Sequence, residues 1–245
     1  MNPQTQKIDN GGTLVQRAMN AVTEYIRSAD LRVGDSLPGE ATFATELGVS
    51  RPVMREAFGA LAALKLIDVG NGRKPRVGAI DGSVIASSLN HAVNTAQITV
   101  PQVWDVRRTI ESRTAALAAE QRTDAEAAEI VALADAMAAS QNDLAALTRN
   151  DIAFHDAIAR ASHNALFVQI VSSFSHLMQV AVPTAWGTRI AATQREVMVR
   201  RHKAVADAIL RRDPAGAVFA MDAHFDTSIG DLLEGMAAAK GSNDD

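Results

Sequence analysis

Gly48 and Ser50 stand two residues apart between two stretches of helical periodicity, and this spacing constrains the fold of the N-terminal region strongly. Gly is favoured at the left-handed position that ends a helix, and Ser is favoured as the residue that caps the next helix. We therefore expect a short helix over 40–47 and a second helix from Arg51 to about Leu64. Two helices joined by so short a turn are typical of a helix-turn-helix.

The helix expected from Arg51 combines an apolar stripe with a basic face. Arg51 and Arg55 lie four residues apart and share the face opposite the stripe, where they are placed to contact base edges and phosphates in a DNA major groove. Taken alone, two arginines at this spacing are more often a solvated face. The stripe consists of residues at i, i+3, i+4 and i+7, namely Met54, Ala57, Phe58 and Leu61.

A basic hairpin is predicted directly after this helix. The segments 66–69 and 75–79 have the composition of short strands, and the turn between them contains Gly70 and Gly72. Together with a helix expected over 13–29, the order is helix, helix, tight turn, helix and hairpin, which is that of a winged helix-turn-helix. The basic residues of the predicted wing are Arg73, Lys74 and Arg76.

Charge is distributed unevenly along the chain. The whole chain has a net charge of −4, but residues 1–80 carry ten Lys or Arg against eight Asp or Glu, so the remainder carries −6. Between Arg51 and Arg76 there are six basic residues against two acidic ones. This local excess is suited to binding the phosphates of DNA.

Composition excludes several classes of protein. The absence of cysteine excludes disulfides, cysteine zinc sites and thiol catalysis, and any metal would have to be bound by His and carboxylate side chains. No run of about 18 apolar residues occurs, and the first 20 residues lack the apolar stretch of a signal peptide. We therefore expect a soluble cytoplasmic protein without a membrane partner. Aromatic residues make up only 4%, which favours closely packed helices.

The N-terminal motifs resemble the DNA-binding domain of the GntR family of bacterial transcription regulators. The resemblance covers residues 10–79 and is carried by LPGE at 37–40, LGVSRP at 47–52 and REA at 55–57. Many members have an arginine where this chain has Ala41, so base preference is expected to differ, or the wing to contribute more of the binding. The residues that the resemblance assigns to DNA contact are Ser50, Arg51, Pro52 and Arg55, with Arg73, Lys74 and Arg76 of the wing.

After Asp81 the periodicity is helical throughout, and a C-terminal all-α antiparallel bundle of six or seven helices is predicted for residues 82–234. Thr123 and Glu126 have the spacing of a capping box, and Pro183 is expected to end a helix. The expected helices are 82–95, one entered at Pro101, one from Thr123, 143–161, 165–182, 189–211 and 215–233.

The histidines of this region are the main indication of a ligand-binding or metal-binding site. Asp151 and His155 are four residues apart on one predicted helix and so project from the same face, while His202 and His224 lie near the middles of the last two helices. A lone histidine on a helix is usually part of the core or solvated. Three imidazoles and one carboxylate together suit a divalent transition metal, with zinc favoured and nickel, cobalt or manganese as alternatives, rather than calcium or magnesium.

The same stretch resembles the FCD ligand-binding domain of the FadR-like subgroup of the GntR family. The resemblance is carried by DIAFH at 151–155, SHN at 162–164, His202 and DAH at 222–224, and spans residues 82–234. It implies that the metal ligands are Asp151, His155, His202 and His224. His91, His163 and His176 have no matching role and are expected to be structural or exposed.

The resemblance also implies an effector pocket. Arg107 and Glu111 match a pair in that subgroup, and the planar guanidinium of Arg107 suits the capture of a carboxylate. The alternative is a surface salt bridge between these two residues. Asn164 is a candidate supporting group in the pocket, or else the cap of the helix that follows it.

These observations predict a mostly α protein with two domains, residues 10–79 and 82–234. The expected function is that of a homodimeric transcriptional repressor, not an enzyme, that binds double-stranded operator DNA and responds to a small carboxylate effector beside the metal ion. Two alternatives stay open. One is a metal-dependent hydrolytic enzyme, and the other is a regulator that senses metal alone.

Overall fold

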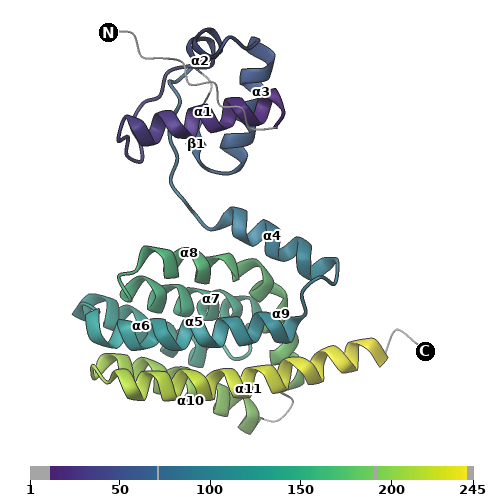
Figure 1. The fold of residues 1–245 in the computed structure, drawn as a ribbon. Coiled ribbons are helices and arrows are strands. Elements are labelled where there is room, and N and C mark those ends of the chain that lie inside the picture. The colour runs from purple at the N-terminus through teal and green to yellow at the C-terminus, as the bar shows by residue number, and fades with distance from the viewer. Residues whose placement is uncertain (1–11, 71, 190–191, 242–245) are drawn as a thin grey trace. The chain divides into compact units, whose positions relative to one another are not determined.

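The computed structural model describes residues 12–70, 72–189 and 192–241, and the chain divides into two compact units, Met1–Val84 and Ile85–Asp245 (Figure 1). Residues 10–11 and 71 of the predicted DNA-binding domain, and residues 190–191 of the predicted helix 189–211, lie outside the described residues. Each unit has its own buried core.

The first unit has the predicted helical order and a short hairpin. Gly48 has the left-handed φ of 63° that ends a helix, and the Ser50 side chain accepts a hydrogen bond from the backbone N–H of Val53 at 3.5 Å. The strands are antiparallel, with Ile67 opposite Val77. The elements are α1 Leu14–Ser28, α2 Glu40–Leu47, α3 Arg51–Ala63, β1 Ile67–Asp68 and β2 Arg76–Val77.

The core of the first unit fixes the orientation of α3. The predicted stripe of Met54, Ala57, Phe58 and Leu61 is buried, and Phe58 packs near the ring of Phe43 at 5.9 Å between centroids. Burying a side chain of this size contributes about 1.5–3 kcal/mol. Because this face of α3 is held inward, the opposite face is left exposed.

The second unit consists of helices in the described residues. The long helices α5 and α11 pack on each other, and α10 packs against both and against α6 (Figure 1). These packed faces position the side chains of the site described below. The elements are α4 Ser83–Asn94, α5 Val100–Gln121, α6 Asp124–Ala139, α7 Leu144–Ala161, α8 Ala165–Ser173, α9 Ser175–Thr188, α10 Ala192–Leu210 and α11 Pro214–Gly241.

The prediction of a single helix over 165–182 is wrong. The chain forms two helices that meet at Phe174 and are bent by 52°, so the described residues after 82 form eight helices rather than six or seven. The Ser173 hydroxyl donates to the carbonyl of Ile170 at 2.6 Å, and such bonding of a serine to the preceding turn bends helices.

Pro183 does not end the helix, contrary to prediction. It lies inside α9, which continues to Thr188. An interior proline removes one backbone hydrogen bond and costs about 3 kcal/mol. Ala185 and Trp186 beyond it are both buried at 5% exposure, and this packing offsets the lost bond.

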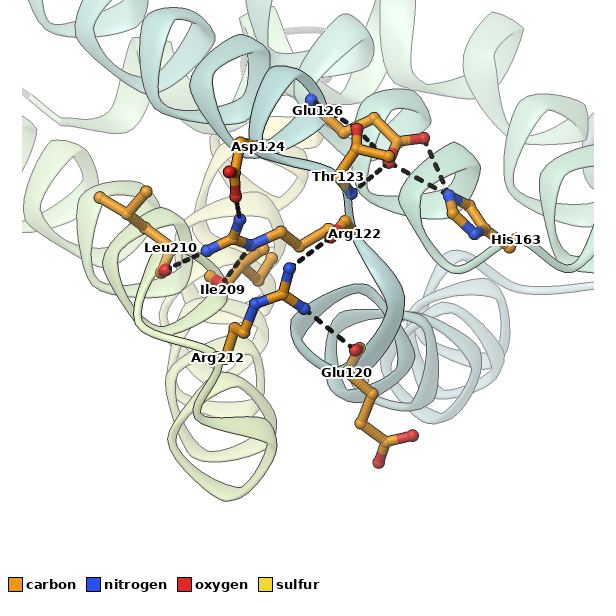
Figure 2. A network of polar contacts seen from close by, with 9 residues as sticks. All are labelled: Glu120, Arg122, Thr123, Asp124, Glu126, His163, Ile209, Leu210 and Arg212. Atoms are coloured by element: carbon orange, nitrogen blue, oxygen red, sulfur yellow. Dashed lines mark hydrogen bonds and ion pairs between the residues drawn. The ribbon is translucent and has the colours of Figure 1, made fainter.

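A polar network links the end of α5 to the end of α10 (Figure 2). Arg122 is only 6% exposed and donates from Nη2 to the carbonyl of Leu210 at 2.5 Å and from Nε to that of Ile209 at 3.5 Å. Arg212 donates in the reverse direction, to the carbonyls of Glu120 at 3.2 Å and Arg122 at 3.0 Å. The network fixes α10 relative to α5.

Beside this network the predicted capping box is present at the start of α6 (Figure 2). The backbone N–H of Thr123 donates to Glu126 Oε2 at 2.7 Å, and His163 Nε2 lies 3.0 Å from Glu126 Oε1. His163 is therefore a surface partner of a helix cap.

Among the described residues no single helix is long and apolar enough to cross a membrane. Only the bent pair α8 and α9, taken together, meets that criterion of length and composition.

Candidate functional site

A small cavity of about 40 Å³ lies inside the second unit, and the predicted metal ligands line it. That volume would hold about three water molecules. Its walls come from α5, α6, α7, α9, α10 and α11, and most of the lining residues are apolar. The polar and charged residues that line it are Arg107, Asp151, His155, Arg189, His202, His224 and Ser228.

The three histidines of the cavity form a compact cluster. Each offers a ring nitrogen, and the three nitrogens lie within 4.8 Å of one another. The ring centroids of His202 and His224 are 4.4 Å apart, and those of His155 and His224 are 5.2 Å apart. All three side chains are buried. Helices α7, α10 and α11 thus bring together residues that are far apart in the sequence.

Each histidine has a distinct environment at its Nδ1 atom. His202 Nδ1 lies 3.0 Å from the carbonyl oxygen of Met198, and His155 Nδ1 contacts Glu111 Oε2. These partners favour a proton on Nδ1, which leaves Nε2 of His155 for another ligand, while Nε2 of His202 faces Asp151. His224 Nδ1 is buried and has no hydrogen-bond partner among the described residues.

Asp151 is placed beside the cluster. Its Oδ1 lies 3.1 Å from His202 Nε2. Burial alone raises the pKa of Asp151, but the hydrogen bond with His202 and the nearby charges of His155, His202 and Arg107 outweigh it and lower the pKa to about 2. The carboxylate is therefore ionised at neutral pH and available as a ligand.

Burial lowers the pKa of both His155 and His224, but the two differ in their neighbours. For His155 the adjacent Glu111 carboxylate outweighs burial, so its pKa is raised. For His224, burial and then the charges of His202, His155 and Arg107 lower the pKa well below its ordinary value. His224 is accordingly neutral at pH 7, which is the form that binds metals.

This arrangement fits a divalent transition metal ion. The buried, unpartnered Nδ1 of His224 and the convergence of three imidazoles are unfavourable unless another group satisfies them. Three imidazoles with an adjacent carboxylate form a donor set that suits zinc and its neighbours. A metal ion at this position would be held by His155, His202 and His224. Asp151 lies close enough to be a fourth ligand.

Arg107 lies in the cavity wall and is not a surface residue. It is 4% exposed and donates from Nε to Glu111 Oε1 at 2.8 Å, while Nη1 contacts Met178 Sδ. Its guanidinium carbon lies 5.2 Å from the Trp104 ring and 5.3 Å from the Phe225 ring. The salt bridge with Glu111 thus exists, but it is buried and orients Arg107 toward the cavity.

Two predicted effector residues lie elsewhere. Glu111 is 1% exposed and does not line the cavity, since its two oxygens face Arg107 and His155. Asn164 caps α8, where its Oδ1 accepts from the backbone N–H of Leu166 at 3.0 Å, and it also lies outside the cavity lining. Glu111 therefore positions other side chains, and Asn164 stabilises a helix end.

Arg189 lines the cavity but was not predicted as a site residue. It is 4% exposed at the end of α9 and forms an ion pair with Asp231 of α11, 42 residues later. No local motif marks it, because both its burial and its partner depend on tertiary packing. Ser228 donates to the carbonyl of His224 one turn earlier at 2.9 Å, and it was missed because its place in the cavity wall depends on how α11 packs.

In the first unit the predicted DNA-contacting residues are all exposed. Among the described residues, no ion pair involves Arg51, Arg73 or Lys74. Arg55 Nε lies 3.7 Å from Glu40 Oε2, and Arg76 Nη1 donates to the carbonyl of Gly34 at 2.6 Å. The turn at Ser50 and the hairpin thus present unpaired cations on one small unit.

Family models match both parts of the chain. The model described as "Bacterial regulatory proteins, gntR family" matches residues 14–77, and the model of the FCD domain matches residues 102–227, which is just over half of the chain.

Similar proteins are transcription regulators. The HTH-type transcriptional regulator LutR of Bacillus subtilis (strain 168) is 30% identical over 215 residues, which cover 86% of this chain and 96% of LutR. The Glc operon transcriptional activator of Escherichia coli (strain K12) is 32% identical over 200 residues, which cover 79% of each chain. The HTH-type transcriptional repressor NanR of Salmonella newport (strain SL254) is 28% identical, covering 83% of this chain and 79% of NanR.

The fold is also that of a solved structure, Streptococcus agalactiae GntR. The two share 20% sequence identity with a TM-score of 0.65, over 87% of this chain and 97% of the other. The predicted fold class, a winged helix-turn-helix followed by a helical domain, is thereby confirmed.

Proposed function

The chain belongs to the GntR family of bacterial regulatory proteins and carries the FCD domain of its FadR-like members, and on that premise we propose that it is a repressor controlled by a small carboxylate effector bound beside a metal ion. Because the family and the relatives are transcription regulators, the chain is a regulator and not an enzyme. The relatives include both an activator and a repressor.

The DNA-binding part of the proposal rests on α3 and the wing. Arg51 and Arg55 would contact operator bases and phosphates, supported by Ser50 and Pro52 at the start of the helix. Arg73, Lys74 and Arg76 would contact the flanking backbone. A single winged helix buries little DNA surface, so we expect the cytoplasmic protein to act as a homodimer on a palindromic operator.

The effector part of the proposal rests on one observation above all. Three imidazoles, an ionised carboxylate and the buried Arg107 all face the same cavity. When bound there, the ion supplies a position that accepts a carboxylate oxygen of the effector. Arg107 is oriented by Glu111 and stacked against aromatic rings, so its remaining donors are fixed for a second interaction with the same acid.

Control of DNA binding requires that the effector bind the DNA-competent and DNA-incompetent forms with different affinity. Coupling of this kind amounts to about 1–3 kcal/mol. In a repressor, the effector would favour the form that releases DNA.

The DNA-binding assignment is tested with DNA fragments enriched from a random library by the purified chain. Arg51→Ala or Arg55→Ala should abolish binding without changing the thermal unfolding temperature, because both side chains are exposed. Arg27→Ala, which removes an exposed cation paired with Glu24 on α1, is the matched control and should bind normally. Unchanged affinity of the α3 variants would refute the assignment.

The effector assignment is tested by thermal shift of the metal-loaded chain against a panel of small carboxylic acids. At least one acid should stabilise the wild type and fail to stabilise His202→Ala. If no acid acts and DNA binding instead follows the concentration of added metal, the protein senses the metal alone.

A further inference from the structure

A second and larger cavity lies beside the one that contains the histidines. It is a groove of about 230 Å³ between α4, α5 and α9, with room for about fifteen to twenty water molecules. Eight of its twelve lining residues are apolar, and they include Val93 of α4, Val103 of α5 and Leu177 of α9. No part of the proposed function uses this space.

The groove and the histidine cavity share a wall. Trp104, Met178 and Ala181 line both of them, so at these positions a single layer of side chains separates the two spaces. The cavity itself, at about 40 Å³, has room for the head of a small acid and little more. Any larger part of a ligand held at the histidines would have to lie beyond this wall.

The side chains of the wall are of adaptable types. Trp104 Nε1 is buried without a hydrogen-bond partner among the described residues, so no hydrogen bond of this group holds the indole in place. Met178 is unbranched and has a flexible thioether, and methionine adapts to its surroundings more readily than other apolar residues. Ala181 contributes only a methyl group. A change of rotamer at Met178 would therefore be a small movement that widens the passage between the two spaces.

The buried part of the groove is apolar. Val103, Trp104 and Met178 are only 4%, 7% and 3% exposed. None of the polar lining residues is buried, and two of them, Asn94 and His176, are exposed. The side of the groove that adjoins the histidine cavity thus suits an apolar group, and water in contact with it gains few hydrogen bonds.

Resting on the proposed function, we infer that the effector is a carboxylic acid with an apolar tail, and that the groove between α4, α5 and α9 binds this tail. The metal cluster and Arg107 hold the carboxylate. The tail passes the wall at Met178 and lies against Val93 and Val103. Its affinity comes from the burial of apolar surface, which is worth about fourfold in binding for each methylene.

A series of straight-chain acids tests this inference. Calorimetric titrations of the metal-loaded full chain compare 2-hydroxypropanoate, 2-hydroxypentanoate and 2-hydroxyheptanoate, which share one head group and differ only in the length of the tail. Each added pair of methylenes should strengthen binding to the wild type by about tenfold. All three acids should fail to bind His202→Ala, because the carboxylate is held at the metal cluster.

A charge placed in the groove separates the tail from the head. Val93→Asp should weaken the seven-carbon acid by at least about tenfold and leave the three-carbon acid within about twofold, with unchanged metal content. Val93 is partly buried, so Val180→Asp, which changes a groove residue that is 69% exposed, serves as a second variant if the first does not fold. Leu166→Asp is the matched control, because Leu166 is 60% exposed on α8 and lies outside the groove.

The possible failures have distinct meanings. Affinity that does not rise with tail length, while the short acid still depends on His202, would overturn this inference and leave the proposed function standing. A long acid that binds His202→Ala as well as the wild type would show that the groove acts without the cavity, which also overturns it. Equal weakening of short and long acids by Val93→Asp and Val180→Asp would reduce the groove to a structural role. Binding of no acid at all would contradict the proposed function, and the inference with it.

Discussion

Glu111 lies outside the cavity but contacts two residues that face it. One oxygen accepts from Arg107 Nε at 2.8 Å, and the other contacts His155 Nδ1. An outer carboxylate of this kind orients a histidine ligand and makes it more basic. Glu111→Gln should therefore weaken metal binding about tenfold, although Glu111 does not reach the cluster. Competition with a chelating dye measures the affinity.

The matched control for Glu111 is Glu129→Gln. Glu129 forms an exposed ion pair with Arg160 on the bundle surface, at 2.6 Å, and its loss should leave metal affinity unchanged. If Glu111→Gln also keeps wild-type affinity, Glu111 has no positioning role at His155.

The pKa values of the cluster predict how metal binding depends on pH. Glu111 raises the pKa of His155 despite burial, so protons compete with a metal for this ring more strongly than they do for an ordinary histidine. Asp151, with a pKa of about 2, and His224, with a lowered pKa, need not lose a proton at neutral pH. Metal affinity should therefore fall as the pH falls from 7.5 to 5.5, by up to about tenfold per unit.

Titration calorimetry in buffers of different ionisation enthalpy checks this result directly. Metal binding should release protons, more of them as the pH falls, and Glu111→Gln should release fewer than the wild type. An affinity that does not change over this pH range would show that His155 is not a ligand.

The sequence carried unequal information about the residues of the site. Asp151 and His155 could be placed on one helical face from their spacing alone, and the structure brings them to the cavity with His202 and His224. Arg189 could not be found in this way, because its partner is 42 residues distant. Glu111 was expected in the pocket, but a residue one helical turn from Arg107 can face the ligand or the neighbouring helix, and spacing does not decide between them.

At the scale of elements, the network around Arg122 fixes the helix ends that carry the site (Figure 2). Arg122→Ala would leave the carbonyl of Ile209, in a buried position, and that of Leu210, in a partly buried one, without this donor. Loss of hydrogen bonds to a charged group costs about 2 kcal/mol. The thermal unfolding temperature should fall by about 6 °C, as calorimetry of the full chain would measure.

Arg160→Ala provides the comparison for this variant. Arg160 forms an ion pair on the surface with both partners about half exposed, so its removal should cost little. If the two variants lower the unfolding temperature equally, the buried position of Arg122 has no special importance.

Helix ends could be predicted best where a capping residue marks them. Thr13, Ser50, Thr123 and Asp143 each accept a hydrogen bond from the first turn of the following helix. No capping side chain in the sequence indicates the break at Phe174. Pro183 suggested a helix end, but it lies inside α9. In both cases the outcome depends on which side chains are buried, and burial is a property of the assembled bundle rather than of the local sequence.

At the scale of the whole molecule, the proposed function makes the two ligands interdependent. If the effector weakens DNA binding by some factor, saturating DNA must weaken effector binding by the same factor, because the two affinities belong to one thermodynamic cycle. We expect a factor of about 5–150. Effector affinity measured by calorimetry, with and without the enriched DNA fragment, should change by the factor found from DNA titrations with and without effector.

Two variants show whether this coupling passes through both sites. In Arg51→Ala, which should not bind DNA, added DNA should leave effector affinity unchanged while the effector itself still binds. In His202→Ala, DNA affinity should be normal and insensitive to the acid. Effector affinity that is the same with and without DNA in the wild type would mean that the cavity and the helix-turn-helix act independently. The bound acid would then be a structural ligand, and control of transcription would have to reside elsewhere in the chain.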